Sequence, residues 1–186
     1  KRERDLRNGF VLPPRIRPGK AAEILLHPGW LWNLLTMPPI TFTNLKDVGS
    51  SRKSHHQYVN EELAYPSANY GDLRRLREMW PGPLLVKGTL TAEDALLALE
   101  CGVDGIVVSN HGGRQVDGAV AALDALVEVR AAVGAGATVL VDGGIRGGAD
   151  VVKAMALGAN AVLVGRPYVY ALAVGGAEGV AALIQQ

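Results

Sequence analysis

The chain has 186 residues and a net charge of +1; 48% of its residues are hydrophobic and 20% are charged. These values are typical of a folded domain and give no overall basis for binding nucleic acid. Cys101 is the only cysteine, which excludes an internal disulfide and favours a reducing, cytoplasmic location. No apolar run reaches the ~18 residues of a membrane span. The first residue is not Met and no signal-peptide core follows it, so we expect the sequence to begin within a larger protein.

Residues 1–70 are basic and irregular. Ten Lys and Arg residues but only four acids lie in residues 1–60, whereas the rest of the chain holds nine bases and fourteen acids. Repeated prolines and a polar stretch over 49–62 predict a long, variable excursion of loop and helix between two strands. Within it, residues 22–45 are apolar, rich in Trp and flanked by basic residues. This composition suits a peripheral contact with the inner face of a membrane, although we favour a helix packed against the protein or another subunit.

From residue 71 onward, helical and apolar segments alternate regularly. Helices are predicted over 72–80, 91–101, 120–133, 149–157 and 169–184. Four short apolar runs, over 84–86, 106–108, 139–141 and 162–164, predict strands between them. Because each run is apolar at every position, we expect strands buried on both faces, as in a parallel sheet flanked by helices. Segments 102–109 and 158–165 resemble each other, which indicates a weak internal repeat.

This alternation predicts repeated β/α units, as in a barrel or a doubly wound sheet. Four units cannot close an eight-stranded barrel, which takes ~250 residues. If the units belong to a TIM (β/α)8 barrel, residues 71–186 supply roughly strands five to eight and their helices. Residues 1–70 then supply the end of the strand-four region and the long excursion. The first four strands would lie outside this chain.

Residues 109–114, Ser-Asn-His-Gly-Gly-Arg, directly follow the second apolar run. His111 lies two residues past the buried strand, in a loop that Gly112 and Gly113 free to bend, and an imidazole there can accept a proton near neutral pH. Arg114 presents a planar guanidinium suited to a carboxylate. The two residues together predict a base and a carboxylate-binding group for a small acid. A capping or loop histidine beside a surface arginine is the alternative.

Residues 142–148 and 165–166 predict an anion-binding site at the ends of the third and fourth apolar runs. Glycines allow backbone N–H groups to approach a phosphate, helix N-termini follow, and Arg146 and Arg166 add positive charge. Barrel enzymes bind phosphate with the loops after their last two strands. The alternative is tight turns with solvated arginines, and the glycine spacing is not that of a dinucleotide-binding fingerprint. Lys87 ends the first run, where it could stabilise negative charge on a reduced cofactor ring or simply extend to water.

Several segments together resemble the FMN-dependent 2-hydroxy-acid dehydrogenase/oxidase family. They are Lys87 with the following glycine, residues 109–117, residues 142–146, residues 165–167 and, near the N-terminus, residues 2–10. The likeness follows the chain in order over nearly its whole length and is weakest over 46–66. It implies a TIM barrel, FMN as cofactor, and oxidation of a small (S)-2-hydroxy acid of the lactate, mandelate or glycolate type to the 2-keto acid.

The resemblance also implies a role for each matching residue. His111 would be the catalytic base, with Asp117 supporting its loop, while Arg114 and Arg2 would hold the substrate carboxylate. The implied FMN contacts are Lys87 at the pyrimidine edge, Ser109 at the seat of the flavin, Asp142 at the ribityl chain, and Gly144, Arg146, Gly165 and Arg166 at the phosphate. A homotetramer is implied, with an electron acceptor that is oxygen, a quinone or a cytochrome.

The same family places its active-site tyrosines, the aspartate that pairs with the histidine and the backbone contacts to flavin N5 in the first half of the barrel. We therefore expect this chain alone to be inactive. One alternative is another FMN- or phosphate-binding barrel enzyme, such as an isomerase, which would leave His111 beside Arg114 unexplained. Another is a half-barrel that only binds flavin. No metal site is expected, because His27, His55 and His56 lack metal-ligand spacing with acids or cysteine.

Overall fold

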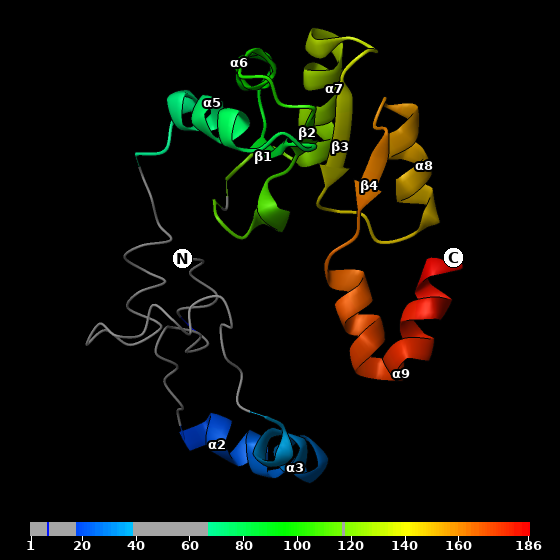
Figure 1. The fold of residues 1–186 in the computed structure, drawn as a ribbon. Coiled ribbons are helices and arrows are strands. Elements are labelled where there is room, and N and C mark those ends of the chain that lie inside the picture. Colours follow the sequence, from blue (N-terminus) through cyan, green and yellow to red (C-terminus); the bar gives the residue numbers. More distant parts are fainter. Residues whose placement is uncertain (1–6, 8–17, 39–66, 117) are drawn as a thin grey trace, which may run out of the picture. The chain divides into compact units, whose positions relative to one another are not determined.

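The computed structural model describes residues 7, 18–38, 67–116 and 118–186. The chain divides into two compact units, Lys1–Ala68 and Asn69–Gln186, and each is described by itself. In the first unit, two short helices, α2 (Pro18–Leu25) and α3 (Pro28–Thr36), follow one another and pack together (Figure 1). A proline begins α3, where its missing N–H would have no helical partner in any case. Arg2 and Asp117, to which the resemblance gives roles, lie outside the described residues.

The second unit contains one parallel sheet of four strands (Figure 1). Its strands are β1 (Leu85–Thr89), β2 (Gly105–Val108), β3 (Thr138–Asp142) and β4 (Ala161–Leu163), side by side in that order. Its α-helices are α5 (Tyr70–Met79), α6 (Ala92–Glu100), α7 (Ala122–Val133), α8 (Gly148–Ala156) and α9 (Arg166–Ile184). The spatial order of the strands follows the chain without the reversal of a doubly wound sheet. The expectation of consecutive β/α units from one half of a (β/α)8 barrel is confirmed.

The α-helices of this unit begin and end within three residues of their expected bounds. Asn69 and Asp72 form a capping box at the start of α5, and the Thr91 hydroxyl accepts the Asp94 N–H at 3.2 Å at the start of α6. Gly134 ends α7 with a φ of +72°, a conformation that favours glycine. These turns set the length of each unit and so bring the carboxyl ends of the strands to one edge of the sheet.

The hydrophobic core lies between the sheet and its helices. Its largest fully buried side chains come from β2, β3 and α7, and they are Ile106, Val108, Leu126, Val129, Val139 and Val141. In both strands the core residues alternate with residues of the opposite face, because successive side chains of a strand point to opposite sides. The opposite face therefore carries Val107 and Ser109 from β2 and its end, and Leu140 and Asp142 from β3.

Burial of the strands differs from the expectation in one respect. Every residue of β2 is buried, as the unbroken apolar run predicted. In contrast, β1 is exposed at three of its five positions, and β4 is exposed at both ends. The physical reason is that β1 and β4 are the edges of this sheet and have a strand neighbour on one side only. The prediction that the strands are buried on both faces is therefore right for β2 and wrong for the edge strands β1 and β4.

Helix α9 also departs from the expectation. Among the described residues it is the one helix long and apolar enough to cross a membrane by length and composition, with a mean hydropathy of 1.4. Its backbone breaks at Gly175 and Gly176, where the φ of Gly176 is +58°, and Figure 1 shows two helical pieces joined at an angle. Each piece of about nine residues extends ~13 Å, against the ~30 Å of a bilayer core. As folded here, α9 is not a single straight span.

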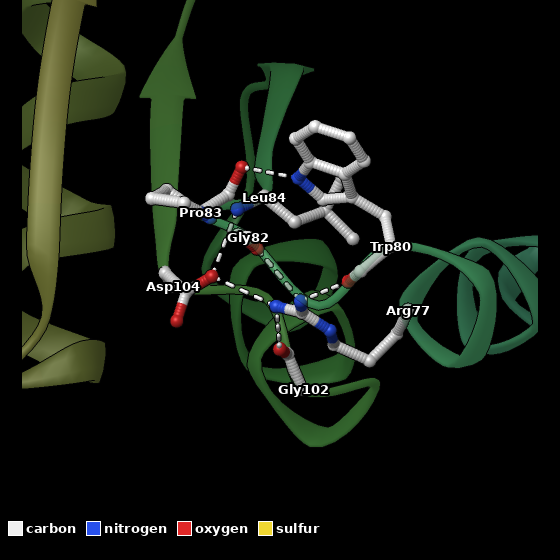
Figure 2. A network of polar contacts seen from close by, with 7 residues as sticks. All are labelled: Arg77, Trp80, Gly82, Pro83, Leu84, Gly102 and Asp104. Carbon is white, nitrogen blue, oxygen red and sulfur yellow. Dashed lines mark hydrogen bonds and ion pairs between the residues drawn. The ribbon is translucent and has the colours of Figure 1, made fainter.

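An arginine-centred network joins the turns at the amino ends of β1 and β2 (Figure 2). The Arg77 guanidinium contacts the Asp104 carboxylate at 2.8 Å, and Asp104 accepts the Leu84 N–H at 2.8 Å. Arg77 also donates to three backbone carbonyls, those of Trp80, Gly82 and Gly102. The Leu84 N–H and then the Arg77 guanidinium hold the pKa of Asp104 below its usual value, because both favour the charged carboxylate.

A second network of the same design lies at the amino ends of β3 and β4. Arg130 of α7 donates to Asn160 Oδ1 at 2.7 Å, and the same oxygen accepts the Val139 N–H at 2.8 Å. Arg130 also donates to the carbonyls of Gly134, Ala137 and Gly158. Asp104 and Asn160 occupy matching positions of the repeat seen in the sequence, which shows that the repeat has a structural counterpart.

Candidate active site

Three polar side chains meet where the strands end, and we call them the strand-end cluster: Lys87, Ser109 and Asp142. The Lys87 ammonium lies 2.6 Å from Ser109 Oγ and 2.5 Å from Asp142 Oδ2. The strand register explains this meeting, because Lys87 pairs with Val107, and Val107 pairs with Leu140. All three cluster residues therefore project from the sheet face opposite the helices. The sequence placed these residues at one rim, and the structure brings them into contact.

The cluster contains an acceptor that no described group satisfies. Asp142 Oδ1 is buried and has no hydrogen-bond partner, whereas Oδ2 of the same carboxylate receives the Lys87 ammonium. A buried polar atom without a partner costs free energy on the order of 1–3 kcal/mol. Such an atom at a functional rim is suited to accept a hydrogen bond from a hydroxyl group of a bound molecule.

His111 stands in a loop of unusual backbone conformation, which we call the histidine loop, residues 109–114. The φ angles of His111, Gly112 and Gly113 are +54°, +62° and +68°, and His111 is the only described residue other than glycine with a positive φ. This conformation is unfavourable by roughly 1–2 kcal/mol for a residue with a Cβ atom. The Ser109 hydroxyl accepts the His111 N–H at 3.0 Å and so supports the turn. Its imidazole is exposed at the rim, where a small molecule can reach it.

Arg114 follows in the same loop, and its backbone N–H donates to the His111 carbonyl at 3.2 Å. Its guanidinium is exposed and, within the described part of the chain, forms no hydrogen bond or ion pair. A guanidinium without a protein partner keeps its full set of donors for a ligand carboxylate. The structure thus leaves Arg114 able to perform the role that the sequence suggested.

The loop after β3, residues 143–147, carries the glycines expected at an anion site. Gly143 and Gly144 have φ angles of +89° and +82°, and a Cβ atom on Gly144 would meet no atom within 4 Å. Gly165, the N-cap of α9, is equally open. These open backbones leave room for a ligand to approach closely. The Arg146 N–H is occupied by Asp150 Oδ2 at 3.0 Å, while the Arg146 side chain is exposed.

Arg166 connects the end of β4 to the histidine loop. Its guanidinium donates to the Gly112 carbonyl at 2.9 Å, which sequence reasoning did not foresee. Arg166 also lines a cavity of about 280 Å³, whose other lining residues are Asn110, Gly112, Gly113, residues 121–123, residues 143–145 and Asp150. The predicted phosphate residues Gly144 and Arg166 therefore border one cavity, whereas Arg146 and Gly165 do not line it.

Asn110 is the residue of this site to which the sequence analysis gave no role. Its side chain accepts the Gly113 N–H at 3.1 Å and donates to the Val120 carbonyl at 3.1 Å. The first of these contacts could have been anticipated, because asparagine often accepts a hydrogen bond from the backbone a few residues later. The second depends on how the chain returns to α7 and has no signal in the sequence.

The described residues fit FMN. The molecule combines a phosphate, a chain of hydroxyl groups and a ring that carries negative charge when reduced. Open glycines and two arginines suit the phosphate, the unsatisfied Asp142 Oδ1 suits a hydroxyl donor, and the Lys87 ammonium suits an anionic ring. The three parts of the site lie along one edge of the sheet, as one extended ligand requires.

Known proteins resemble the chain along its whole length. The sequence profile of the family described as FMN-dependent dehydrogenase matches residues 1–186. An L-lactate oxidase from Nostoc sp. is 45% identical over 183 residues, which are 98% of this chain and 45% of that protein. The chain thus spans about half the length of the curated relatives it matches.

Two solved structures are similar as well. The crystal structure of the monotopic membrane protein (S)-mandelate dehydrogenase matches 99% of this chain and 49% of its own, with 39% identity and a TM-score of 0.84. The crystal structure of a mandelate oxidase with benzoyl-formic acid matches 63% of this chain and 35% of its own, with 53% identity and a TM-score of 0.61. With parallel β/α units, a rim that fits FMN and a family profile matched from end to end, this chain belongs to the FMN-dependent dehydrogenase family.

Proposed function

We propose that the protein containing this chain oxidises a small (S)-2-hydroxy acid to the 2-keto acid, with FMN as cofactor and His111 as base. The observation that carries the proposal is the hydrogen-bonded series from the His111 N–H to Ser109 Oγ to the Lys87 ammonium. It ties the loop that carries a base to the cation that suits a reduced flavin. The relatives named L-lactate oxidase and (S)-mandelate dehydrogenase support the same class of substrate.

The chemistry divides between the cofactor and the chain. FMN, when bound, would accept the two electrons and one of the two protons that leave the hydroxy acid. The His111 imidazole takes a proton from the substrate, because it is the side chain of the histidine loop suited to act as a general base. Arg114 holds the substrate carboxylate, and Arg2 is proposed to share this role. The Lys87 ammonium stabilises negative charge that develops at the rim, and such electrostatic stabilisation is usually a large contribution to catalysis.

The proposal is tested by mixing the whole flavoprotein with L-lactate, glycolate or (S)-mandelate in the absence of oxygen. We expect at least one of them to bleach the flavin absorbance. His111→Ala should keep FMN but lose bleaching, while His27→Ala, a change at an exposed residue between α2 and α3, should behave as the wild type. Rapid bleaching of the His111→Ala protein would remove the histidine from its role. Adding oxygen afterwards distinguishes an oxidase from a dehydrogenase.

We also propose that the first unit contacts a membrane surface through α2 and α3. The apolar side chains of these helices are exposed, with Leu25 at 69%, Trp32 at 68% and Leu35 at 72%. At ~1.5 Å per residue, α3 extends only about 13 Å, so it can lie in the interface but cannot cross the bilayer. The monotopic membrane protein whose structure matches 99% of this chain supports this assignment.

Sedimentation with vesicles tests the membrane proposal. The wild-type protein should sediment with anionic vesicles at low salt, and the Trp32→Ala/Leu35→Ala variant should bind several-fold less. Asn33→Ala, in the same helix, is the matched control and should bind as the wild type. If the apolar variant instead changes the oligomeric state by light scattering, the helices pack on another subunit. The homotetramer and the identity of the electron acceptor stay predictions.

A further inference from the structure

The Asn110 side chain forms hydrogen bonds at both ends of its amide. Oδ1 accepts the Gly113 N–H inside the histidine loop, and Nδ2 donates to the carbonyl of Val120, ten residues further along the chain. Val120 immediately precedes Ala121, the N-cap of α7, which has no side-chain cap of its own. Asn110 therefore closes the segment from 110 to 120 and ties its far end to the start of a helix that belongs to the core.

Asn110 also contacts the loop after β3. A Cβ atom added to Gly143 would lie 3.1 Å from Asn110 Oδ1, so the amide packs directly against this loop. Gly143 has a φ of +89° and borders the same cavity as Asn110. One half-buried side chain thus touches the histidine loop, the approach to α7 and the loop proposed to bind phosphate.

The histidine loop needs such support because its backbone is unfavourable. Three successive left-handed residues include His111, whose Cβ atom makes this conformation costly. Among the described side chains, Ser109 supports the loop on the strand side, Arg166 donates to its Gly112 carbonyl, and Asn110 supports it on the helix side. The Ser109 bond fixes where the loop leaves β2, and among the described residues the Asn110 amide is the side chain that ties the loop to the approach to α7.

We propose that Asn110 is a positioning residue that sets the placement of the His111 imidazole, and this rests on the function proposed above. Asn110 does not need to touch the substrate for this role. It acts through the backbone at Gly113 and Val120, and both the donor and the acceptor of its amide are required. Misplacing a catalytic group by about 1 Å can lower a rate by on the order of 100-fold.

The test compares Asn110→Ala and Asn110→Asp with Val116→Ala, a control at an exposed apolar residue of the same segment. In the whole flavoprotein we expect flavin reduction at saturating substrate to slow about 10- to 100-fold in both Asn110 variants, with FMN content and substrate affinity unchanged. Substrate deuterated at C2 should show a larger isotope effect, which loss of folding alone would not produce. A wild-type reduction rate, or a loss that matches lost FMN, overturns the proposal.

Amide hydrogen exchange in the flavin-free protein gives an independent readout. Residues 111–114 should exchange faster in Asn110→Ala, but near the wild-type rate in Asn110→Asp, which keeps the acceptor for the Gly113 N–H. Unchanged exchange in Asn110→Ala overturns the positioning role of Asn110. If the wild-type protein oxidises none of the three acids, that result counts against the proposed function alone, and the exchange measurement still tests the positioning role. If Asn110→Ala does not fold, Asn110→Asp is the variant compared with the wild type. A wild-type rate of flavin reduction in Asn110→Asp would show that the bond to the Val120 carbonyl is not needed and would overturn the proposal.

Discussion

Replacing Lys87 by methionine should destabilise the flavin-free protein through the charge that is left behind. The Lys87 ammonium lies 2.5 Å from Asp142 Oδ2, with side-chain exposures of 43% and 18%. Exposed ion pairs contribute about 0.2–1 kcal/mol, and breaking a buried pair costs about 3–5 kcal/mol. This half-buried pair lies between these limits. Because Asp142 Oδ1 already lacks a partner, we expect Lys87→Met to cost about 1–2 kcal/mol.

Urea unfolding measures this cost as a lower midpoint with an unchanged slope. For a chain of this size, the melting temperature should fall by ~2–8 °C. The double variant Lys87→Met/Asp142→Asn removes the unpaired charge of the Asp142 carboxylate together with the lysine. Its free energy of unfolding should be about 1 kcal/mol higher than that of Lys87→Met. If Lys87→Met costs under about 0.3 kcal/mol and the two changes are additive, the ion pair does not stabilise the fold and the reasoning is wrong.

Three further predictions concern the core, the rim and the edge of the second unit. Leu126→Ala should cost about 2–5 kcal/mol in urea unfolding, since Leu126 is fully buried; a cost under 1 kcal/mol would contradict its place in the core. Gly112→Ala should weaken FMN binding in a fluorescence titration, because the new Cβ atom would lie 2.7 Å from the Arg166 guanidinium; unchanged affinity would show that this contact is dispensable. The hydrogen bond to the Asp94 carboxylate raises the pKa of Tyr70 to about 12, so its stabilising contribution is complete below pH 10 and disappears as the pH rises to 12. In an ultraviolet titration, the tyrosine ionisation step at the highest pH should be missing from Tyr70→Phe, and an unchanged titration curve would refute this assignment.

The sequence could predict the strand-end cluster because two simple rules meet there. Apolar runs located the strands, and the first polar residue after each run marked the rim, which placed Lys87, Ser109 and Asp142 at one edge. Their contact follows from the period of two along each strand and from the register of β1, β2 and β3. The start of α6 and the end of α7 were equally accessible, because Thr91 and Gly134 act within one turn of the helices they delimit.

The remaining features depend on distances between segments far apart in the chain. The bond from Arg166 to the Gly112 carbonyl joins residues 54 positions apart, and no local pattern specifies it. The bond from Asn110 to Val120 depends on the path of a loop between them. Exposure of β4 also had no local signal, because Val162 and Leu163 are as apolar as the residues of β2, and only their place at the sheet edge differs.

The two ends of the sheet serve different purposes in this unit. At the amino ends, Arg77 and Arg130 each join two successive turns through carbonyls and one side-chain oxygen, an arrangement that orders the backbone. At the carboxyl ends, Asp142 has an unsatisfied oxygen and Arg114 an unpaired guanidinium among the described residues. Strands of at most five residues, ~17 Å long, separate the two ends. Barrel enzymes keep stabilising contacts at the amino ends and chemistry at the carboxyl ends. The repeated arginine networks therefore allow the carboxyl-end loops to carry unfavourable backbone and unpaired charge, because each β/α pair is already fixed at its opposite end.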